Sequence, residues 1–239
     1  MPLFLCSPYE LPSIPAEGSD PYQTSVSTLI KVGGTSGSNS IVNKDNSITV
    51  VGGVQASTTI TKFGSSASFD GSSGYLDLGS TPGRLGPGDF TVEVWLYILP
   101  QTSLFPTVFS NYGTWGTNTG EFALFVGHSS SDRSRIQVSF DGAFPAIRST
   151  IPYATSTWTH VAVVRLNNIV TLYLDGKANG SFVSSKDVVG NRGISWIGNA
   201  GDEPGRGYYN GYMEEFRITS GIARYTGNFT PPTSPFPTA

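Results

Sequence analysis

The chain has 239 residues, a charged fraction of only 13% and a formal net charge of -3. Because it contains no lysine- or arginine-rich run, it lacks the electrostatic footprint of a nucleic-acid-binding protein, and we expect no nucleic acid partner. The single cysteine, Cys6, excludes an internal disulfide and every multi-cysteine metal site. The 29 glycines and 16 prolines favour short strands joined by many turns.

Residues 1–21 predict an extended, proline-rich N-terminal arm, followed by one domain over residues 22–239. Prolines at positions 2, 8, 12, 15 and 21 are incompatible with helix interiors and central strands. Such an arm either stays disordered or docks on a neighbouring protein, where prolines reduce the cost of ordering. The start lacks a basic segment and the chain lacks a long apolar run, so we expect neither a signal peptide nor membrane insertion.

After the arm, segments of strand-like composition alternate with turns rich in glycine, serine and asparagine. No stretch of similar length shows apolar residues at the spacing of an amphipathic helix, so we predict an all-β fold. The expected strands are Ser27–Val32, Ser47–Val51, Ser66–Phe69, Tyr75–Leu78, Phe90–Leu99, Thr107–Ser110, Glu121–Val126, Arg135–Phe140, Ala146–Ser149, Trp158–Leu166, Ile169–Leu174, Ser181–Val183, Ser195–Ile197 and Gly211–Thr219.

Two of these strands predict a hairpin. Thr159–Leu166 and Ile169–Leu174 are separated by Asn167-Asn168, and asparagine tolerates the positive φ that a two-residue hairpin turn needs. Asp175-Gly176 begins a second turn of this kind. Consecutive antiparallel strands at this spacing predict an antiparallel sandwich or barrel without parallel crossovers.

The segment DFTVEVWLYI, at residues 89–98, alternates between two kinds of side chain. One face is aliphatic and is expected to lie in the core, whereas the other is amphipathic and suits a concave surface. The aliphatic set is Val92, Val94, Leu96 and Ile98, and the amphipathic set is Thr91, Glu93, Trp95 and Tyr97.

The segment NGYMEEFRIT, at residues 210–219, predicts the closing strand. Strict alternation places Glu214 on the apolar face with Phe216, and places Glu215 with Arg217 on the opposite face. Because a buried, unpaired carboxylate is costly, we expect Glu214 to bind backbone amides or a basic side chain such as Arg224. Glu215 and Arg217 are expected to pair. We interpret these four charged residues as a structural clasp.

Four segments resemble, in this order, the laminin-G-like, concanavalin A-like jelly-roll domains. They are KFGSSASFDGSSGYLDLG (62–79), DFTVEVWLY (89–97), TWTHVAVVRLNNIVTLYLDGKANG (157–180) and GYMEEFRITSGIARYTGNFTPP (211–232). The resemblance covers about residues 27–237 and implies an antiparallel two-sheet jelly-roll sandwich. The segment GIARYTGNFTPPTSPFP resembles the version found on structural proteins of tailed bacteriophages, notably cyanophages. There such domains serve as tail-fibre or capsid-decoration modules.

The carboxylates do not show the spacing of a glycoside hydrolase. A retaining hydrolase needs two carboxyls about 5 to 5.5 Å apart, and on one strand only positions two or four apart share a face. The hydrolases of this fold carry E-x-D-x-x-E, whereas Glu214 and Glu215 are adjacent and Glu93 is alone on its strand. We therefore expect no enzyme activity and no catalytic residue. Acids from different strands that meet in space remain the alternative.

Calcium is the one cofactor that the sequence leaves open. Oxygen ligands suit calcium, and related domains often hold one. The segment FDGSSGYLD offers Asp70 and Asp77 as candidate ligands. No loop has the density of acidic residues that would make a strong site, and Asp70-Gly71 is more simply explained as a turn.

Exposed aromatic rings in loops are the best candidates for ligand binding, because they can hold the flat faces of sugars. Two glycine-rich loops present the candidates Tyr112 and Trp115, and Tyr208 and Tyr209. The competing interpretation is that these rings cover the ends of the sandwich or lie in a subunit contact.

Two functions follow from these patterns. The first, favoured by the resemblance, is a non-enzymatic virion protein, a capsid decoration or tail-surface module that binds phage capsid or tail proteins through its arm and forms a homo-oligomer. The alternative is a carbohydrate-binding adhesion module that recognises a glycan on the host surface.

Overall fold

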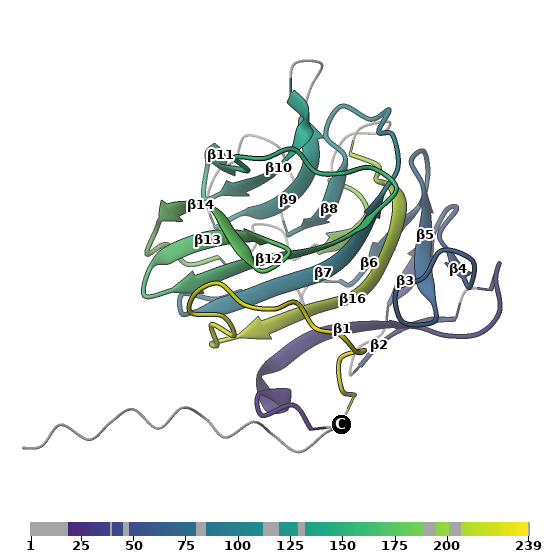
Figure 1. Cartoon of the computed structure of the whole chain (residues 1–239), viewed down its shortest axis with the longest axis horizontal. Coiled ribbons are helices and arrows are strands. Elements are labelled where there is room, and N and C mark those ends of the chain that lie inside the picture. Colours follow the sequence, from purple (N-terminus) through teal and green to yellow (C-terminus); the bar gives the residue numbers. More distant parts are fainter. Residues whose placement is uncertain are drawn as a thin grey trace, which may run out of the picture.

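The computed structural model describes residues 19–38, 40–44, 48–79, 85–111, 120–128, 132–188, 195–200 and 207–238. These residues form two antiparallel sheets packed face to face, as predicted (Figure 1). The only helical element among them is the short 3-10 turn Gln23–Ser25. None of them forms a helix that is long and apolar enough to cross a membrane. The predicted arm lies outside the described residues as far as Gly18.

The nine-stranded sheet has the order β14-β13-β12-β7-β16-β1-β2, and β5 pairs with β16 and with β4. The seven-stranded sheet has the order β11-β10-β9-β8-β15-β6-β3. The strands are β1 (Val26–Val32), β2 (Ile41–Asn43), β3 (Thr49–Val51), β4 (Gln55–Ser57), β5 (Ser66–Asp70), β6 (Tyr75–Asp77), β7 (Phe90–Ile98), β8 (Thr107–Ser110), β9 (Phe122–His128), β10 (Asp132–Phe140), β11 (Ala143–Arg148), β12 (Trp158–Leu166), β13 (Ile169–Leu174), β14 (Lys177–Val183), β15 (Trp196–Ile197) and β16 (Asn210–Ser220).

The predicted hairpin between β12 and β13 is confirmed. Asn167 and Asn168 have φ values of 50° and 69°, and Leu166 is paired with Ile169 across the turn. Asp175 and Gly176, at φ 47° and 74°, make the turn into β14. Sequence analysis missed the three-residue strands β2 and β4, since such short pieces carry too few residues to show a period.

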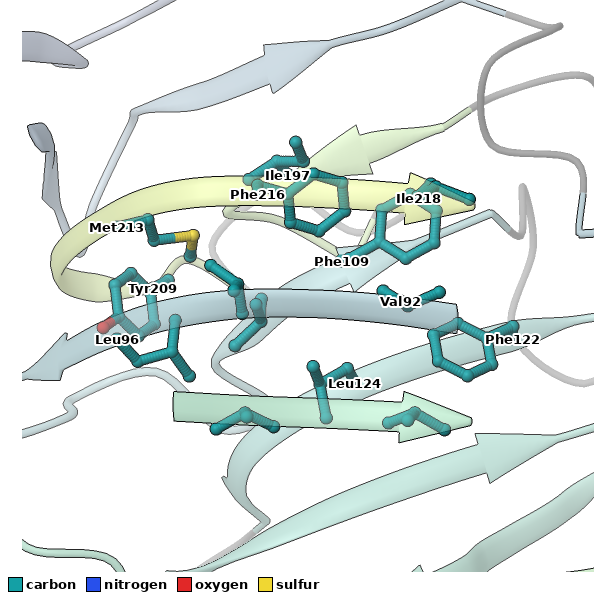
Figure 2. Packing of buried hydrophobic residues seen from close by; sticks show 14 of the residues in the cluster. Val92, Leu96, Phe109, Phe122, Leu124, Ile197, Tyr209, Met213, Phe216 and Ile218 are labelled. Carbon is teal, nitrogen blue, oxygen red and sulfur yellow. The ribbon is translucent and has the colours of Figure 1, made fainter. Parts of the chain in front are cut away.

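The core lies between the two sheets. The aliphatic face predicted for β7 is confirmed, because Val92, Val94, Leu96 and Ile98 are all fully buried there. Figure 2 shows Val92 and Leu96 facing rings and aliphatic side chains from β8, β9, β15 and β16. The amphipathic set of β7 therefore lies on the outer face of the nine-stranded sheet, the face turned away from the core.

A β-bulge corrects the predicted faces of β16. Glu214 is opposite Trp95 and Arg217 is opposite Glu93, so β16 has one residue more than β7 over this interval. The extra residue is Glu215, whose φ is 56°. Met213 and Phe216 both lie in the core, and the two glutamates between them both lie on the outer face. The prediction that Glu214 shares a face with Phe216 is therefore wrong, because strict alternation fails at a bulge.

The residues that follow β16, Gly221–Thr238, form a segment that we call the C-terminal strap. Figure 1 shows the strap, in yellow, crossing in front of β16 and β1. Tyr225 and Phe229 are stacked with centroids 3.5 Å apart and pack on Ala162 and Tyr173 of the outer face. Farther along, Phe236 packs on β1. The strap thus covers much of the outer face of the nine-stranded sheet.

The bulge gives a test of the fold. Deleting Glu215 should cost only about 1 to 3 kcal/mol, because without the extra residue Met213 and Phe216 are two positions apart and both keep the core face, while the carboxylate that binds Lys31 is lost. Glu215→Gly should stay folded and lose about 1 to 3 kcal/mol, since glycine accepts the positive φ but removes the carboxylate. Urea unfolding of the three proteins measures this difference. A deletion variant that loses roughly 4 kcal/mol or more would show that Glu215 is not the extra residue of β16.

Candidate functional site

A buried ion pair lies at the centre of the outer face of the nine-stranded sheet. Arg217 Nε and Nη2 donate to Glu93 Oε1 at 2.9 and 2.7 Å, and Tyr225 of the strap donates its hydroxyl to Glu93 Oε2 at 2.7 Å. His160 Nε2 lies 3.4 Å from the same oxygen. Burial alone would raise the pKa of the Glu93 carboxyl, but Arg217, His160 and Tyr225 hold that pKa well below its usual range.

Asp20 connects this pair to the start of the domain. Its carboxylate accepts hydrogen bonds from Arg217 Nη1 at 3.0 Å and from Arg224 Nη1 and Nη2 at 3.0 and 2.7 Å. Burial would raise the pKa of Asp20, but the hydrogen bonds from Arg224 and from the Tyr22 amide lower it. Two arginines from the last part of the chain therefore hold a residue just after the predicted arm.

The glutamates of the predicted clasp bind partners other than those expected. Glu215 pairs with Lys31 at 2.5 Å and accepts the Phe236 amide at 2.6 Å, so the predicted pair between Glu215 and Arg217 is wrong. The reason is that Arg217 turns to the fully buried Glu93 instead. Arg224 does not reach Glu214 but binds Asp20.

Glu214 binds two backbone amides, one of the two outcomes expected from the sequence. Its Oε2 accepts the Lys62 amide at 2.7 Å and its Oε1 accepts the Phe63 amide at 2.8 Å. These amides belong to the segment between β4 and β5, which extends over Trp95, with Lys62 Nζ 4.1 Å from the Trp95 ring centroid. Burial raises the pKa of Glu214 in spite of these two hydrogen bonds.

The end of the outer face carries an aromatic row that the strap leaves half-buried. Tyr97 is opposite Trp158 of β12 on one side and opposite Tyr212 of β16 on the other. The centroid of the Tyr97 ring is 5.6 Å from that of Trp158 and 5.9 Å from that of Tyr212. The same register continues through Ser68 of β5 to Gln55 of β4. Three rings, a hydroxyl and a carboxamide therefore lie in one line across five strands.

The row is held in place from the side. Trp158 Nε1 donates to the Thr61 carbonyl at 3.1 Å, which fixes the orientation of the indole. Sequence analysis had placed Tyr97 on a surface-lining face but did not find the row, because cross-strand neighbours depend on register. The signal available in the sequence was an aromatic residue at or near one end of each of three predicted strands.

The four aromatic residues predicted to bind ligand have different outcomes. Tyr112 and Trp115 lie outside the described residues. Tyr208 is half-buried and lies near Tyr75 on the outer face of the seven-stranded sheet. Tyr209 is fully buried in the core, where it packs against Phe69, and its hydroxyl donates to the Tyr97 carbonyl at 3.1 Å. The prediction that Tyr209 is a surface ligand is wrong, because adjacent residues of an extended segment point in opposite directions.

The two predicted calcium ligands are not brought together, since Asp70 ends β5 and Asp77 ends β6 in the other sheet. Asp70 accepts the amides of Ser72, Ser73 and Gly74, which is the turn that the sequence favoured. The described residues contain no group of three or more side chains suited to hold a metal ion. Calcium binding stays a prediction.

Comparison with known proteins gives a family and several structural neighbours. The family described as the concanavalin A-like lectin/glucanases superfamily matches residues 70–223. A comparison with curated protein sequences gives no match.

Among solved structures, domain 4 of AbnA, an extracellular arabinanase from Geobacillus stearothermophilus in complex with arabinotriose, is similar with a TM-score of 0.51 and 20% identity over 74% of this chain and 82% of that domain. The binding domain of botulinum neurotoxin serotype D/C has a TM-score of 0.58 and 14% identity over 83% of this chain. A putative carbohydrate-binding protein from Bacteroides ovatus has a TM-score of 0.54 and 19% identity over 71% of this chain. The chain spans 49% and 46% of these last two. These likenesses concern the fold.

The ion pair generates a pH-dependent prediction. Because the pKa of Glu93 is lower in the folded state, its contribution to stability is present above its unfolded pKa of roughly 4.3 and is lost as the pH falls below that value. Glu93→Gln should cost about 3 kcal/mol at neutral pH, and the difference from the wild type should shrink at acidic pH. Urea unfolding from neutral pH to about pH 3 measures it, with exposed Asp187→Asn as the control. A difference that does not change with pH would contradict this assignment.

Glu214 gives a second prediction. Glu214→Ala should lower the free energy of unfolding by about 1 to 3 kcal/mol, because two amides lose their acceptor while the cost of burying a carboxylate is relieved. Lys62→Ala, which keeps the backbone amide, should have a smaller effect. Thermal unfolding of both variants compares them, and a Glu214→Ala variant as stable as the wild type would disprove the clasp.

Proposed function

The chain belongs to the concanavalin A-like lectin/glucanases superfamily, and we propose that it is a carbohydrate-binding module whose ligand lies on the aromatic row. The observation that carries this proposal is the line of Trp158, Tyr97 and Tyr212, in register on adjacent strands and continued by Ser68 and Gln55. Structural neighbours described as a carbohydrate-binding protein and as a domain in complex with arabinotriose support it.

The row combines the two features that sugar recognition needs. Half-buried rings offer apolar faces to the C–H side of a sugar, and polar side chains at the border fix its hydroxyls. Adjacent strands are about 4.8 Å apart, so the three aromatic positions span roughly 10 Å. This length suits an oligosaccharide better than a single sugar.

The row is also preorganised. Its rings stand on central strands of the nine-stranded sheet, and the Thr61 carbonyl holds the Trp158 indole. A site whose side chains are already ordered loses less conformational entropy when it binds. We therefore propose that the ligand binds to the rigid sheet without the loop closure that is typical of sites built on loops.

We propose binding without catalysis. The carboxylates of this face all have partners within the protein: Glu93 binds Arg217, Glu214 binds two amides, and Glu215 binds Lys31. A general acid or nucleophile would have to be free to meet the glycosidic bond.

The virion location, the phage capsid or tail partners and the homo-oligomer stay predictions from the sequence. A glycan-binding module is compatible with an adhesion role on a particle surface. Glycan binding by the domain does not depend on that role.

Tyr97→Ala provides the test, because Tyr97 is the central ring of the row. Glycan-array screening of the wild type identifies a sugar, and titration calorimetry then compares the variants. Tyr97→Ala should weaken binding about tenfold or more, with a small change in thermal stability. Phe182→Ala, which removes a half-buried ring of β14 at the opposite end of the same sheet, is the control. A wild type without any array hit would overturn the proposed function.

A further inference from the structure

A second group of aromatic side chains lies on the opposite side of the sandwich. Trp196 of β15 is opposite Asp77 of β6, and Tyr75 is two residues before Asp77 on the same face. Leu76 and Ile197, the residues that alternate with them, lie in the core. Tyr75, Asp77 and Trp196 therefore share the outer face of the seven-stranded sheet.

The two rings make a compact, half-buried pair. The centroids of Tyr75 and Trp196 are 4.7 Å apart and the ring planes are tilted by 39°. Tyr208 lies beside them, because the amide of the next residue, Tyr209, donates to the Gly198 carbonyl just after β15 at 3.0 Å while the Tyr209 ring points into the core. Two residues singled out from the sequence for different reasons, Asp77 and Tyr208, thus meet at one place.

The indole N–H of Trp196 is a hydrogen-bond donor that needs an acceptor. Its Nε1 is buried and has no acceptor in the part of the chain that the structure describes. A buried N–H without a partner costs free energy, so native structures usually supply one. In the row on the other sheet, Trp158 Nε1 does have an acceptor, the Thr61 carbonyl. The missing partner of Trp196 is what a bound molecule with an oxygen acceptor would provide.

Asp77 supplies a hydrogen-bond acceptor. One of its oxygens, Oδ1, accepts the Gly79 amide at 2.8 Å, and no partner of Oδ2 lies among the described residues. A carboxylate oxygen next to an aromatic pair can accept a hydrogen bond from a sugar hydroxyl, whereas its negative charge would repel an anionic ligand. The chemistry of the group therefore matches a neutral sugar, which carries an apolar face, hydroxyl donors and oxygen acceptors.

We propose that Tyr75, Trp196 and Tyr208, with Asp77, form a second carbohydrate-binding site for neutral sugars. A sugar ring lies against the Tyr75–Trp196 pair, donates a hydroxyl to Asp77 and accepts the Trp196 N–H. This inference rests on the proposed function. It makes the domain bivalent, because each site lies on the outer face of one of the two sheets. The sheets pack about 10 Å apart through their inner faces, so the two sites point in opposite directions.

Bivalency has a consequence that a single site lacks. Two sites that face away from one another bind two different glycan chains, so one molecule can bridge two glycan-bearing surfaces or strengthen its attachment to one of them. Oligosaccharide-coated beads therefore give a direct readout of the second site.

The test compares four full-length proteins on one array of immobilised neutral and acidic glycans: wild type, Tyr97→Ala, Trp196→Phe and the double variant. Trp196→Phe keeps an aromatic ring but removes the N–H, which should weaken binding at this site roughly three- to tenfold. The Tyr97→Ala variant should still bind a set of neutral glycans, and Trp196→Phe should bind the same set more weakly than the wild type. The double variant should show the weakest binding of the four proteins. Beads coated with those glycans should be cross-linked by the wild type and less by either single variant.

The outcomes separate the two proposals. If Tyr97→Ala abolishes all binding while Trp196→Phe changes nothing, the second site is wrong and the proposed function stands. If the wild type binds no glycan, both fail. If neither variant changes the wild-type pattern, both placements of the ligand are wrong. Phe182→Ala again controls for the loss of an aromatic ring elsewhere.

Discussion

The buried pair of Glu93 and Arg217 is the contact on which the rest of the outer face depends. Both side chains are removed from water in the middle of a sheet, so neither tolerates the loss of the other. Each also reaches a segment from elsewhere in the chain. Glu93 accepts the Tyr225 hydroxyl of the C-terminal strap, and Arg217 donates to Asp20 at the start of the domain. One ion pair therefore holds both the C-terminal strap and the start of the domain against the sheet.

The strap buries the middle of the outer sheet face and leaves only one end of that face accessible. Its rings pack on the middle of the sheet, and its Phe236 lies 3.6 Å below the Arg217 guanidinium and against β1. What it leaves half-buried is the end row of Trp158, Tyr97 and Tyr212. A surface that is amphipathic along its whole length in the sequence is thus divided in the structure, with the charged residues sealed and the aromatic ones available.

Sequence reasoning succeeded where one period holds from end to end. The fourfold aliphatic alternation of β7 and the Asn167-Asn168 turn both depend on local chemistry, and both are confirmed. It failed at β16, where one residue with positive φ changes the phase, because no local rule requires a bulge between two glutamates. The error at Tyr208 and Tyr209 is the opposite one, because alternation holds there and puts the two rings on opposite sides of one segment.

The aromatic row could not be derived from the sequence, because it is a property of register. Each of its rings lies at or near one end of a predicted strand, but only the pairing of β12, β7 and β16 brings them into line. Register in turn is fixed by which side chains must be buried, so the row depends on the core as much as on its own residues.

Glu214 connects the clasp to the row. It holds the amides of Lys62 and Phe63, and the residue just before them, Thr61, supplies the carbonyl that fixes the Trp158 indole. A carboxylate that the sequence predicts to be part of a structural clasp therefore also acts on the aromatic row, because it positions the backbone that orients the Trp158 ring. The bulge makes this possible, because only the displaced phase of β16 turns Glu214 outward toward that segment. The stability of the fold and the proposed recognition of a glycan therefore depend on the same strand.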